Sequence, residues 1–358
     1  MQPVVRLAKT ATAAIGAALI AAVSLSGCTA KETDSADSGS RAEITVDASD
    51  TDRALPATQA GTRPRTLRIP NNGTKVTEFY VYGEGDRVMG EVENISPGLQ
   101  RTLIVNLTDP GPYQTACKPG MIGDGIRKDF VVTGPAVQAG NDAKSQAAVD
   151  DYKSYVLSQS DALVPATEAF ASAVRAGDVS KAKALYPTTR TFWERIEPVA
   201  ESFPNDLDPR MDLREADLTP GQKWTGFHRL EKDLWVSGIQ PDSAAVADQL
   251  VADVKELNSA VKAPAWTIDV TQIAGGAQGL LDEVAATKIT GEEDIFSHTD
   301  LWDFDANVEG SRTAIASVRP ILDERNPDLG ERVDQRFADV EALLAKYRSG
   351  DGFVSYTT

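Results

Sequence analysis

The chain has 358 residues and 41% of them are apolar, so it is long enough and apolar enough to form more than one folded domain. Its 53 acidic residues outnumber its 36 basic residues and give a formal net charge of −17, which argues against a protein that binds the phosphate backbone of nucleic acid. The presence of only two histidines and two cysteines excludes, within one chain, a three-histidine metal site, a four-cysteine zinc site and a disulfide-rich scaffold.

The N-terminal segment has the features of a bacterial lipoprotein signal. Arg6 and Lys9 are followed by an uncharged run of mostly small and apolar residues, which ends in the lipobox sequence Leu25-Ser-Gly-Cys28. The run is shorter than the roughly 20 residues that a membrane-spanning helix needs, which disfavours a transmembrane anchor. We therefore expect a signal peptide over residues 1–27 and lipidation of Cys28, which would attach the protein to the outer face of the bacterial cell membrane.

Two regions of different amino-acid composition follow this segment. Residues 28–41 are small and polar and predict a disordered tether. Between residues 42 and 134, short β-prone runs alternate with Gly, Pro, Asn and Asp, which predicts a small all-β sandwich. The predicted strands lie at 43–46, 66–69, 78–82, 102–106 and 130–132.

The region from residue 141 to 358 has the periodicity of amphipathic helices and predicts an all-α bundle. The predicted helices cover 142–175 with a kink at Pro165, then 178–203, 224–235, 243–260, 278–289, 303–322 and 326–348. The fold class expected from the whole chain is therefore multidomain, with a β-sandwich followed by a helical bundle.

One predicted helix carries an ionisable pair where core residues are expected. Trp224, His228, Glu231 and Trp235 are spaced i, i+4, i+7 and i+11, so they would share one helical face. A buried carboxylate needs a cation, a donor network or a metal. The pattern alone leaves two interpretations equally open: a hydrogen-bonded His–Glu pair, or a site for iron or zinc.

A second acidic pair, Glu194 and Glu197, is also spaced i, i+3. The pattern alone favours a solvated acidic face. Metal sites in helical bundles also use carboxylates and histidines at this spacing, so a metal-binding role stays open.

Several long motifs resemble the EfeO family, which comprises extracytoplasmic iron-transport proteins with an imelysin-type, peptidase-like helical domain. The similar motifs are Glu194-Arg-Ile-Glu-Pro-Val-Ala-Glu201, Gly226-Phe-His-Arg-Leu-Glu231, Gly291-Glu-Glu-Asp294 and His298-Thr-Asp-Leu-Trp-Asp-Phe-Asp-Ala-Asn-Val-Glu-Gly310. The resemblance covers about residues 140–354. It implies a metal site that contains His228 and Glu231 with further carboxylates. It also favours a metal-binding role for Glu194 and Glu197 over a solvated acidic face. By motif matching, these carboxylates are Glu194, Glu197 and Asp212, with Glu283 as a weaker candidate.

The same resemblance implies that the β-sandwich is cupredoxin-like. The segment from Gly111 to Cys117 is similar to a cupredoxin turn, but residues 42–134 contain no histidine, which excludes a type 1 copper centre. A second metal site of Cys117, Met121 and Glu78 stays possible. Glu91 and Glu93 are further candidate ligands of that site. The alternative is a docking or spacer domain with a buried cysteine.

The function that the resemblance implies is capture of iron, as Fe³⁺ or Fe²⁺ with Zn²⁺ also possible, in an EfeUOB-like uptake system. The expected partners are a membrane iron permease and a Dyp-type peroxidase, and no catalytic activity is expected. One alternative is an imelysin-type metallopeptidase, although the chain lacks a His-Glu-x-x-His motif. Another is a lipoprotein that binds haem or an anionic polymer. Because family members usually continue past Phe353, we also expect the bundle to lack a C-terminal helix.

Overall fold

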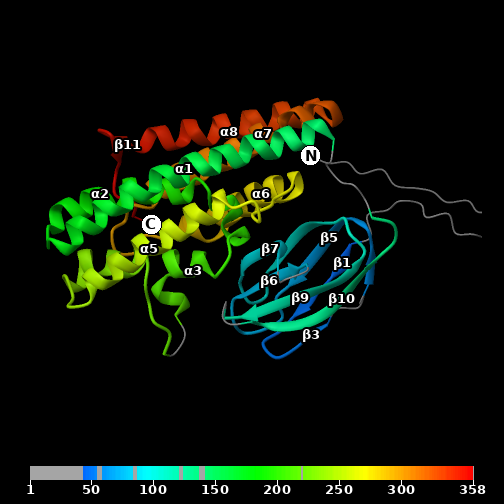
Figure 1. The fold of residues 1–358 in the computed structure, drawn as a ribbon, viewed down its shortest axis with the longest axis horizontal. Helices are drawn as coiled ribbons and strands as arrows, with labels where there is room; N and C mark the ends of the chain where they lie inside the picture. The colour runs from blue at the N-terminus through cyan, green and yellow to red at the C-terminus, as the bar shows by residue number, and fades with distance from the viewer. Residues whose placement is uncertain are drawn as a thin grey trace, which may run out of the picture. The chain divides into compact units, whose positions relative to one another are not determined.

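The computed structural model describes residues 43–54, 59–83, 87–120, 124–136, 142–218 and 221–357. The predicted signal peptide, the tether and the lipidation of Cys28 lie outside the described residues. The predicted order of a β domain followed by a helical domain is confirmed (Figure 1). Within the described part of the chain, no helix is long and apolar enough to cross a membrane.

The β domain consists of two main sheets. The strands are β1 (Ile44–Thr45), β2 (Asp47–Ala48), β3 (Arg53–Ala54), β4 (Gln59–Gly61), β5 (Arg63–Pro70), β6 (Thr77–Tyr82), β7 (Val88–Ile95), β8 (Gln100–Leu107), β9 (Gly111–Pro119) and β10 (Ile126–Thr133). One sheet has the order β1-β5-β8, the other has the order β4-β10-β9-β6-β7, and β2 pairs with β3. The β1–β5 and β4–β10 pairs are parallel, whereas the pairs between neighbouring long strands are antiparallel.

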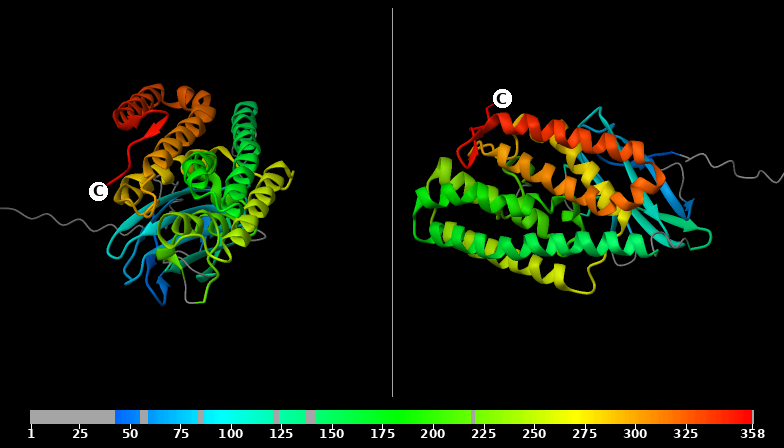
Figure 2. Two further views of the ribbon diagram at one scale, coloured as in Figure 1. Left: turned by 90° about the vertical axis from the view of Figure 1, so that its left-hand side faces the viewer. Right: turned by 90° about the horizontal axis from the view of Figure 1, so that it is seen from above.

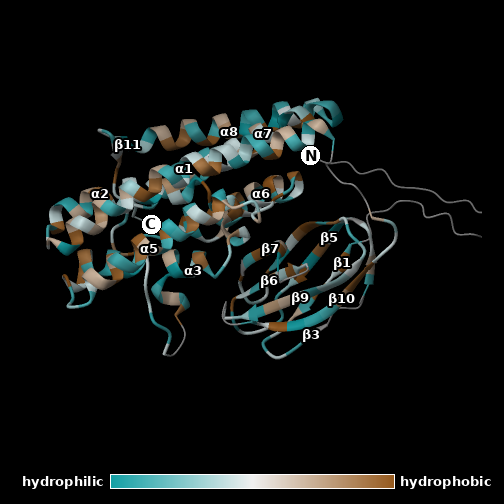
Figure 3. Cartoon of the chain, viewed as in Figure 1, coloured by the Kyte–Doolittle hydropathy of each residue, from teal (hydrophilic) through white to brown (hydrophobic). Residues whose placement is uncertain are grey.

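The core of the sandwich is made by alternate residues of the two sheets. Leu67 and Val105 of the smaller sheet share one buried apolar cluster with Phe79 and Phe130 of the larger sheet. Figure 3 shows the corresponding mixture of hydrophobic and hydrophilic residues along the strands. The five predicted strands correspond to β1, β5, β6, β8 and β10. The sequence did not predict β7, whose pattern is interrupted by Gly90, or β9, which was interpreted as a turn.

The helical domain contains eight α-helices and several short helical turns in the described residues. They are α1 (Ala143–Arg175), α2 (Val179–Glu194), η2 (Glu197–Ser202), α3 (Leu207–Asp212), η3 (Glu215–Asp217), α4 (Phe227–Lys232), η4 (Asp233–Ser237), α5 (Ser243–Lys262), α6 (Val270–Ala286), η5 (Lys288–Thr290), α7 (Asp300–Arg325), α8 (Pro327–Leu344) and η6 (Ala345–Tyr347). A short hairpin of β11 (Arg348–Ser349) and β12 (Gly352–Phe353) follows. Helix α1 packs against α2, α5 and α7, and α8 packs against α7 (Figure 2).

Two predicted helices are shorter than expected. The helix predicted over 178–203 ends at Glu194, because the backbone at Ile196 leaves the helical region and Pro198 has no N–H to donate. A 3₁₀ turn then covers Glu197–Ser202. The helix predicted over 224–235 begins only at Phe227 and continues into a π-helical turn, so Trp224 precedes it.

Glycines allow α6 and α7 to pack closely on the backbone of η2 and of the residue that follows α2. A Cβ atom on Gly276 of α6 would lie 1.8 Å from the carbonyl oxygen of Pro198, and one on Gly310 of α7 would lie 2.2 Å from that of Arg195. No side chain larger than hydrogen fits at such distances without a shift of the backbone. The two helices therefore hold the segment that follows Glu194 in a fixed position.

We expect Gly276→Ala to lower the free energy of unfolding by roughly 1–3 kcal/mol, since the added methyl overpacks a backbone contact. Gly279→Ala, three residues along the same helix, is the matched control, because nothing lies within 4 Å of its added Cβ. The control should raise stability by about 0.5–1 kcal/mol through helix propensity alone. Chemical denaturation of both variants measures the difference, and equal effects would contradict the proposed contact.

Candidate metal centre

A glycine places the start of α4 against the end of α3. Gly226 has a φ of 90°, and a Cβ atom there would lie 2.1 Å from the carbonyl oxygen of Met211. The hydroxyl of Thr225 donates a hydrogen bond to the carbonyl oxygen of Arg210 at 2.9 Å, which fixes the same junction. His228, in the first turn of α4, therefore lies next to Asp212, the last residue of α3.

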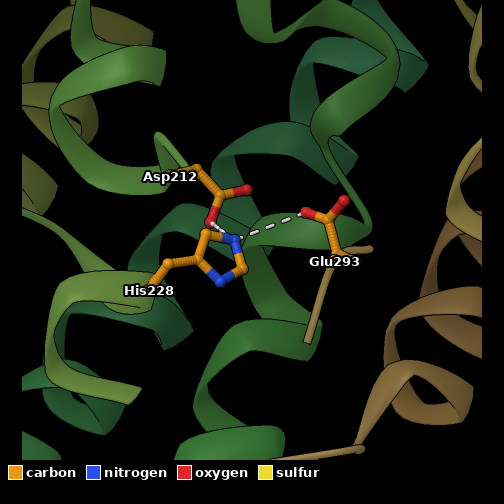
Figure 4. Close-up of side chains that lie close together, drawn as sticks. All are labelled: Asp212, His228 and Glu293. Carbon is orange, nitrogen blue, oxygen red and sulfur yellow. Dashed lines mark ion pairs between the residues drawn. The ribbon is translucent and has the colours of Figure 1, made fainter. Parts of the chain in front are cut away.

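One nitrogen of the His228 ring faces two carboxylates (Figure 4). Its Nε2 lies 3.3 Å from Oδ1 of Asp212 and 3.5 Å from Oε1 of Glu293, in a geometry that makes no hydrogen bond. The His228 side chain is almost entirely buried, with 1% of the residue exposed. The three groups offer ligand atoms that all lie within 4.8 Å of one another, which is close enough to hold one metal ion after small shifts.

The other ring nitrogen of His228 faces Glu231. Nδ1 lies 3.3 Å from Oε2 of Glu231, while Oε1 of the same carboxylate accepts the backbone N–H groups of Phe296 at 3.0 Å and Ser297 at 2.7 Å. Both oxygens of Glu231 are thus engaged. A carboxylate that accepts from Nδ1 orients the ring and leaves Nε2 for a metal. His228, Glu231 and Asp294 form a second compact group, in which burial raises the pKa of Asp294 and so disfavours its ionised form.

The electrostatics distinguish the two carboxylates at Nε2 from their neighbours. Burial opposes ionisation of Asp212, but Arg190 and His228 outweigh it and hold the pKa of Asp212 well below its ordinary value. The pKa of Glu293 is likewise lowered against the effect of burial, chiefly by Lys288. In contrast, burial and then Glu231 raise the pKa of Asp294 to about 7. Asp212 and Glu293, which face Nε2, are therefore kept ionised.

His228 itself is held in its charged form. Burial and the nearby Arg190 favour the neutral ring, but Asp212 and Glu231 outweigh them and raise the pKa of His228 well above its ordinary value. The surroundings of the ring in the metal-free protein therefore favour its protonated form.

Two further buried cations lie among the carboxylates. Arg190 of α2 is fully buried and forms ion pairs with Glu194, Asp212, Glu293, Asp294 and Asp303. Lys288 of η5 is 1% exposed, and its Nζ lies 2.7 Å from Glu197, 3.4 Å from Glu194 and 3.7 Å from Glu293. These two side chains provide the charge that burial of so many carboxylates requires.

A family model described as Imelysin (Peptidase_M75) matches residues 148–355. The chain is 43% identical over 294 residues to proteins named "Iron uptake system component EfeO" from Escherichia coli strain K12, Escherichia coli O157:H7 and Shigella flexneri. Each match covers 80% of this chain and 76% of the relative. The chain belongs to the EfeO family. Its helical domain is an imelysin domain.

Two solved structures are similar to the N-terminal region. Reduced auracyanin from Roseiflexus castenholzii is 15% identical, with a TM-score of 0.22, and covers 27% of this chain and all of its own. Auracyanin A from Chloroflexus aurantiacus, described as a blue copper protein, is 14% identical, with a TM-score of 0.20, and covers 25% of this chain and 99% of its own. Likeness at this level says nothing about copper in the EfeO-family chain.

The predicted ligands divide into two groups in the structure. His228, Glu231 and Asp212 lie together. Glu194 and Glu197 contact Lys288 and share the side-chain amide of Asn307, and among the described residues no contact joins either of them to His228. Their role as ligands, inferred from the EfeO resemblance, thus stays a prediction.

Glu283, the weaker candidate, lines a cavity of about 600 Å³ together with Asp212 and Glu293. Burial raises the pKa of Glu283 to about 7, and the charge of Lys288 opposes this effect. The cavity thus borders both carboxylates that face Nε2 of His228.

Several residues of the centre were not predicted as ligands or partners. Glu293 and Asp294 belong to the motif Gly291-Glu-Glu-Asp294, which carried part of the resemblance, but it was not interpreted as a ligand source. The sequence pattern did not indicate that Arg190 and Lys288 are buried, because a basic residue on a helix is usually solvated.

The structure does not bring the second predicted site together. Cys117 is buried in the sandwich core and pairs in register with Phe79, whereas Glu78 pairs in register with Lys118. Since neighbouring residues of a strand point to opposite faces, the thiol and the Glu78 carboxylate lie on opposite faces of the sheet. Met121 lies outside the described residues.

Of the further candidates for that site, Glu93 lies instead with Glu201 and Asp208. All three are half-buried, and groups of acidic side chains of this kind are common without an ion. Burial raises the pKa of Glu91, and the nearby charge of Glu93 adds to this rise.

If Glu231 orients His228 without binding the metal, Glu231→Gln should weaken Zn²⁺ binding by about 10–100-fold and leave one ion bound per chain. Glu292→Gln is the matched control, because Glu292 pairs with Arg214 and is partly exposed. Competition with a chromophoric chelator measures both affinities and stoichiometries. A loss of stoichiometric binding in Glu231→Gln would instead make Glu231 a ligand.

Proposed function

We propose that this protein captures iron outside the cytoplasmic membrane and passes it to a membrane permease. The observation that carries the proposal is the convergence of Nε2 of His228, Oδ1 of Asp212 and Oε1 of Glu293 at a buried point where Nε2 makes no hydrogen bond. A buried imidazole nitrogen that faces two ionised carboxylates provides the donor set of a cation site.

The chemistry of these donors suits a transported ion. One imidazole and two carboxylates bind Fe²⁺, Fe³⁺ and Zn²⁺, and the hard oxygens favour iron over copper. Three protein ligands leave coordination positions for water or for a group of the receiving protein. Binding and release then proceed by ligand exchange, without covalent catalysis, as expected of a carrier.

Membership of the EfeO family supports a place in an iron uptake system. A lipid anchor on Cys28 would keep the protein beside the permease, and a Dyp-type peroxidase would be the second partner. The net charge of −17 would raise the local concentration of cations around the protein.

A metallopeptidase activity has less support. The sequence has no His-Glu-x-x-His motif, so the second histidine and the general base of that arrangement are missing. Glu231, the carboxylate nearest His228 in sequence, is engaged by two backbone N–H groups and the ring. Hydrolysis of a generic peptide that disappears in His228→Ala would revive this alternative.

His228→Ala should weaken Zn²⁺ and Fe²⁺ binding by roughly 100-fold or more. This loss is larger than the one expected for Glu231→Gln, because His228 binds the metal itself. His298→Asn is the control, since His298 is exposed and its φ of 58° is one that asparagine adopts readily. Isothermal titration of both variants, with Fe²⁺ handled anaerobically, gives the affinities. Unchanged binding in His228→Ala, or an equal loss in both variants, would contradict the site.

Metal binding should also release protons. Because the pKa of His228 is raised, the ring is protonated before metal arrives, and Nε2 must lose its proton to become a ligand. We expect about one proton released per Zn²⁺ near pH 7, so affinity falls as the pH is lowered. Titrations in buffers of different ionisation enthalpy measure this number, and a binding enthalpy independent of the buffer would be inconsistent with it.

A further inference from the structure

Arg190 contacts the same oxygen atoms that face His228. Its Nη1 donates to Oδ1 of Asp212, and its Nη2 donates to Oε1 of Glu293 at 3.3 Å. These are the two oxygens that lie 3.3 Å and 3.5 Å from Nε2. The lone pairs that would bind a metal are therefore occupied by a guanidinium in the metal-free protein.

The same side chain has a second set of partners away from the metal centre. Nε of Arg190 donates to Oδ2 of Asp303 at 3.0 Å, and Nη2 also donates to Glu194. Asp294 lies 3.7 Å from Nε. If Asp212 and Glu293 turn to a metal ion, the guanidinium keeps three carboxylates around it. It can therefore leave the metal ligands and still donate to buried acidic side chains.

We propose that Arg190 is a built-in competitor of the transported cation, which limits the affinity of the centre and speeds the release of the ion. This inference rests on the proposed function, because it concerns the same site. Arg190 holds the two carboxylates in place before the ion arrives. It forms the same hydrogen bonds with them again when the ion leaves. Each contact it regains lowers the free energy of the emptied centre. A carrier that must give up its cargo requires such a device, because a site of preformed anionic ligands would otherwise release the ion slowly.

Two substitutions of Arg190 distinguish the effect of its hydrogen bonds to the ligand oxygens from the effect of its positive charge. Arg190→Gln removes both, whereas Arg190→Lys keeps the charge but ends one bond short of the Nη atoms. We expect Arg190→Gln to tighten Zn²⁺ binding by about tenfold or more, which is the worth of a charge-assisted hydrogen bond. Arg190→Lys should tighten it by a smaller factor. Stopped-flow displacement of Zn²⁺ by excess chelator should show that slower dissociation accounts for most of the gain.

Arg214→Gln is the control for the loss of a nearby positive charge. Arg214 lies 3.7 Å from Oε2 of Glu293 and pairs mainly with Asp217 and Glu292, so it contacts neither shared oxygen. Its removal should change Zn²⁺ affinity less than Arg190→Lys does. Equal tightening by Arg214→Gln would mean that charge alone acts, and unchanged or weaker binding in both Arg190 variants would overturn the inference.

Arg190→Gln could fail to fold without metal, because it leaves buried carboxylates uncompensated. In that case circular dichroism follows folding as Zn²⁺ is added. Recovery of native helicity at saturating Zn²⁺ supports the inference, since the ion then takes the place of the guanidinium. Failure to recover assigns Arg190 a structural role and contradicts it. If His228→Ala leaves binding unchanged, the proposed function fails; if only the Arg190 variants behave as wild type, the inference alone fails.

Discussion

The burial of many carboxylates at one place is the constraint that shapes the helical domain. Carboxylates cannot be removed from water together unless cations lie among them. Arg190 and Lys288 meet this need, and each is surrounded by at least three acidic side chains. Nearly every element that lines the centre contributes one of these charges. These ion pairs therefore connect the elements of the helical domain, in addition to the apolar core.

The backbone supports this arrangement through a few close contacts. Gly226 allows the start of α4 to pack against the end of α3. Gly276 and Gly310 allow α6 and α7 to pack against the segment that follows Glu194. The loop before α7 holds Glu231 through two backbone N–H groups. Asp212, His228 and Glu231 thus lie on segments that these contacts hold together. Such close contacts keep the donors near one another, so that only small shifts are needed to bind an ion.

The sequence predicted the fold class because periodicity is a local property. Long amphipathic helices such as α5 and α7 were found within a few residues of their ends, whereas β9 was missed because its glycine and prolines resemble a turn. The site was harder to predict. The position of His228 in a core stripe was visible, but the partners of Glu194 and Glu197 depend on Lys288, which lies about ninety residues away. Only the fold determines which carboxylate meets which cation.

The two histidines of this chain differ sharply in their surroundings. His228 is buried among charges, and His298 is exposed on a loop. A proton-detected spectrum of the imidazole groups therefore contains two ring systems, one protected from exchange with solvent and one that exchanges freely. The protected signal reports directly on the nitrogen that faces Asp212 and Glu293. Loading, unloading and transfer of an ion can be followed on the intact protein without an added label.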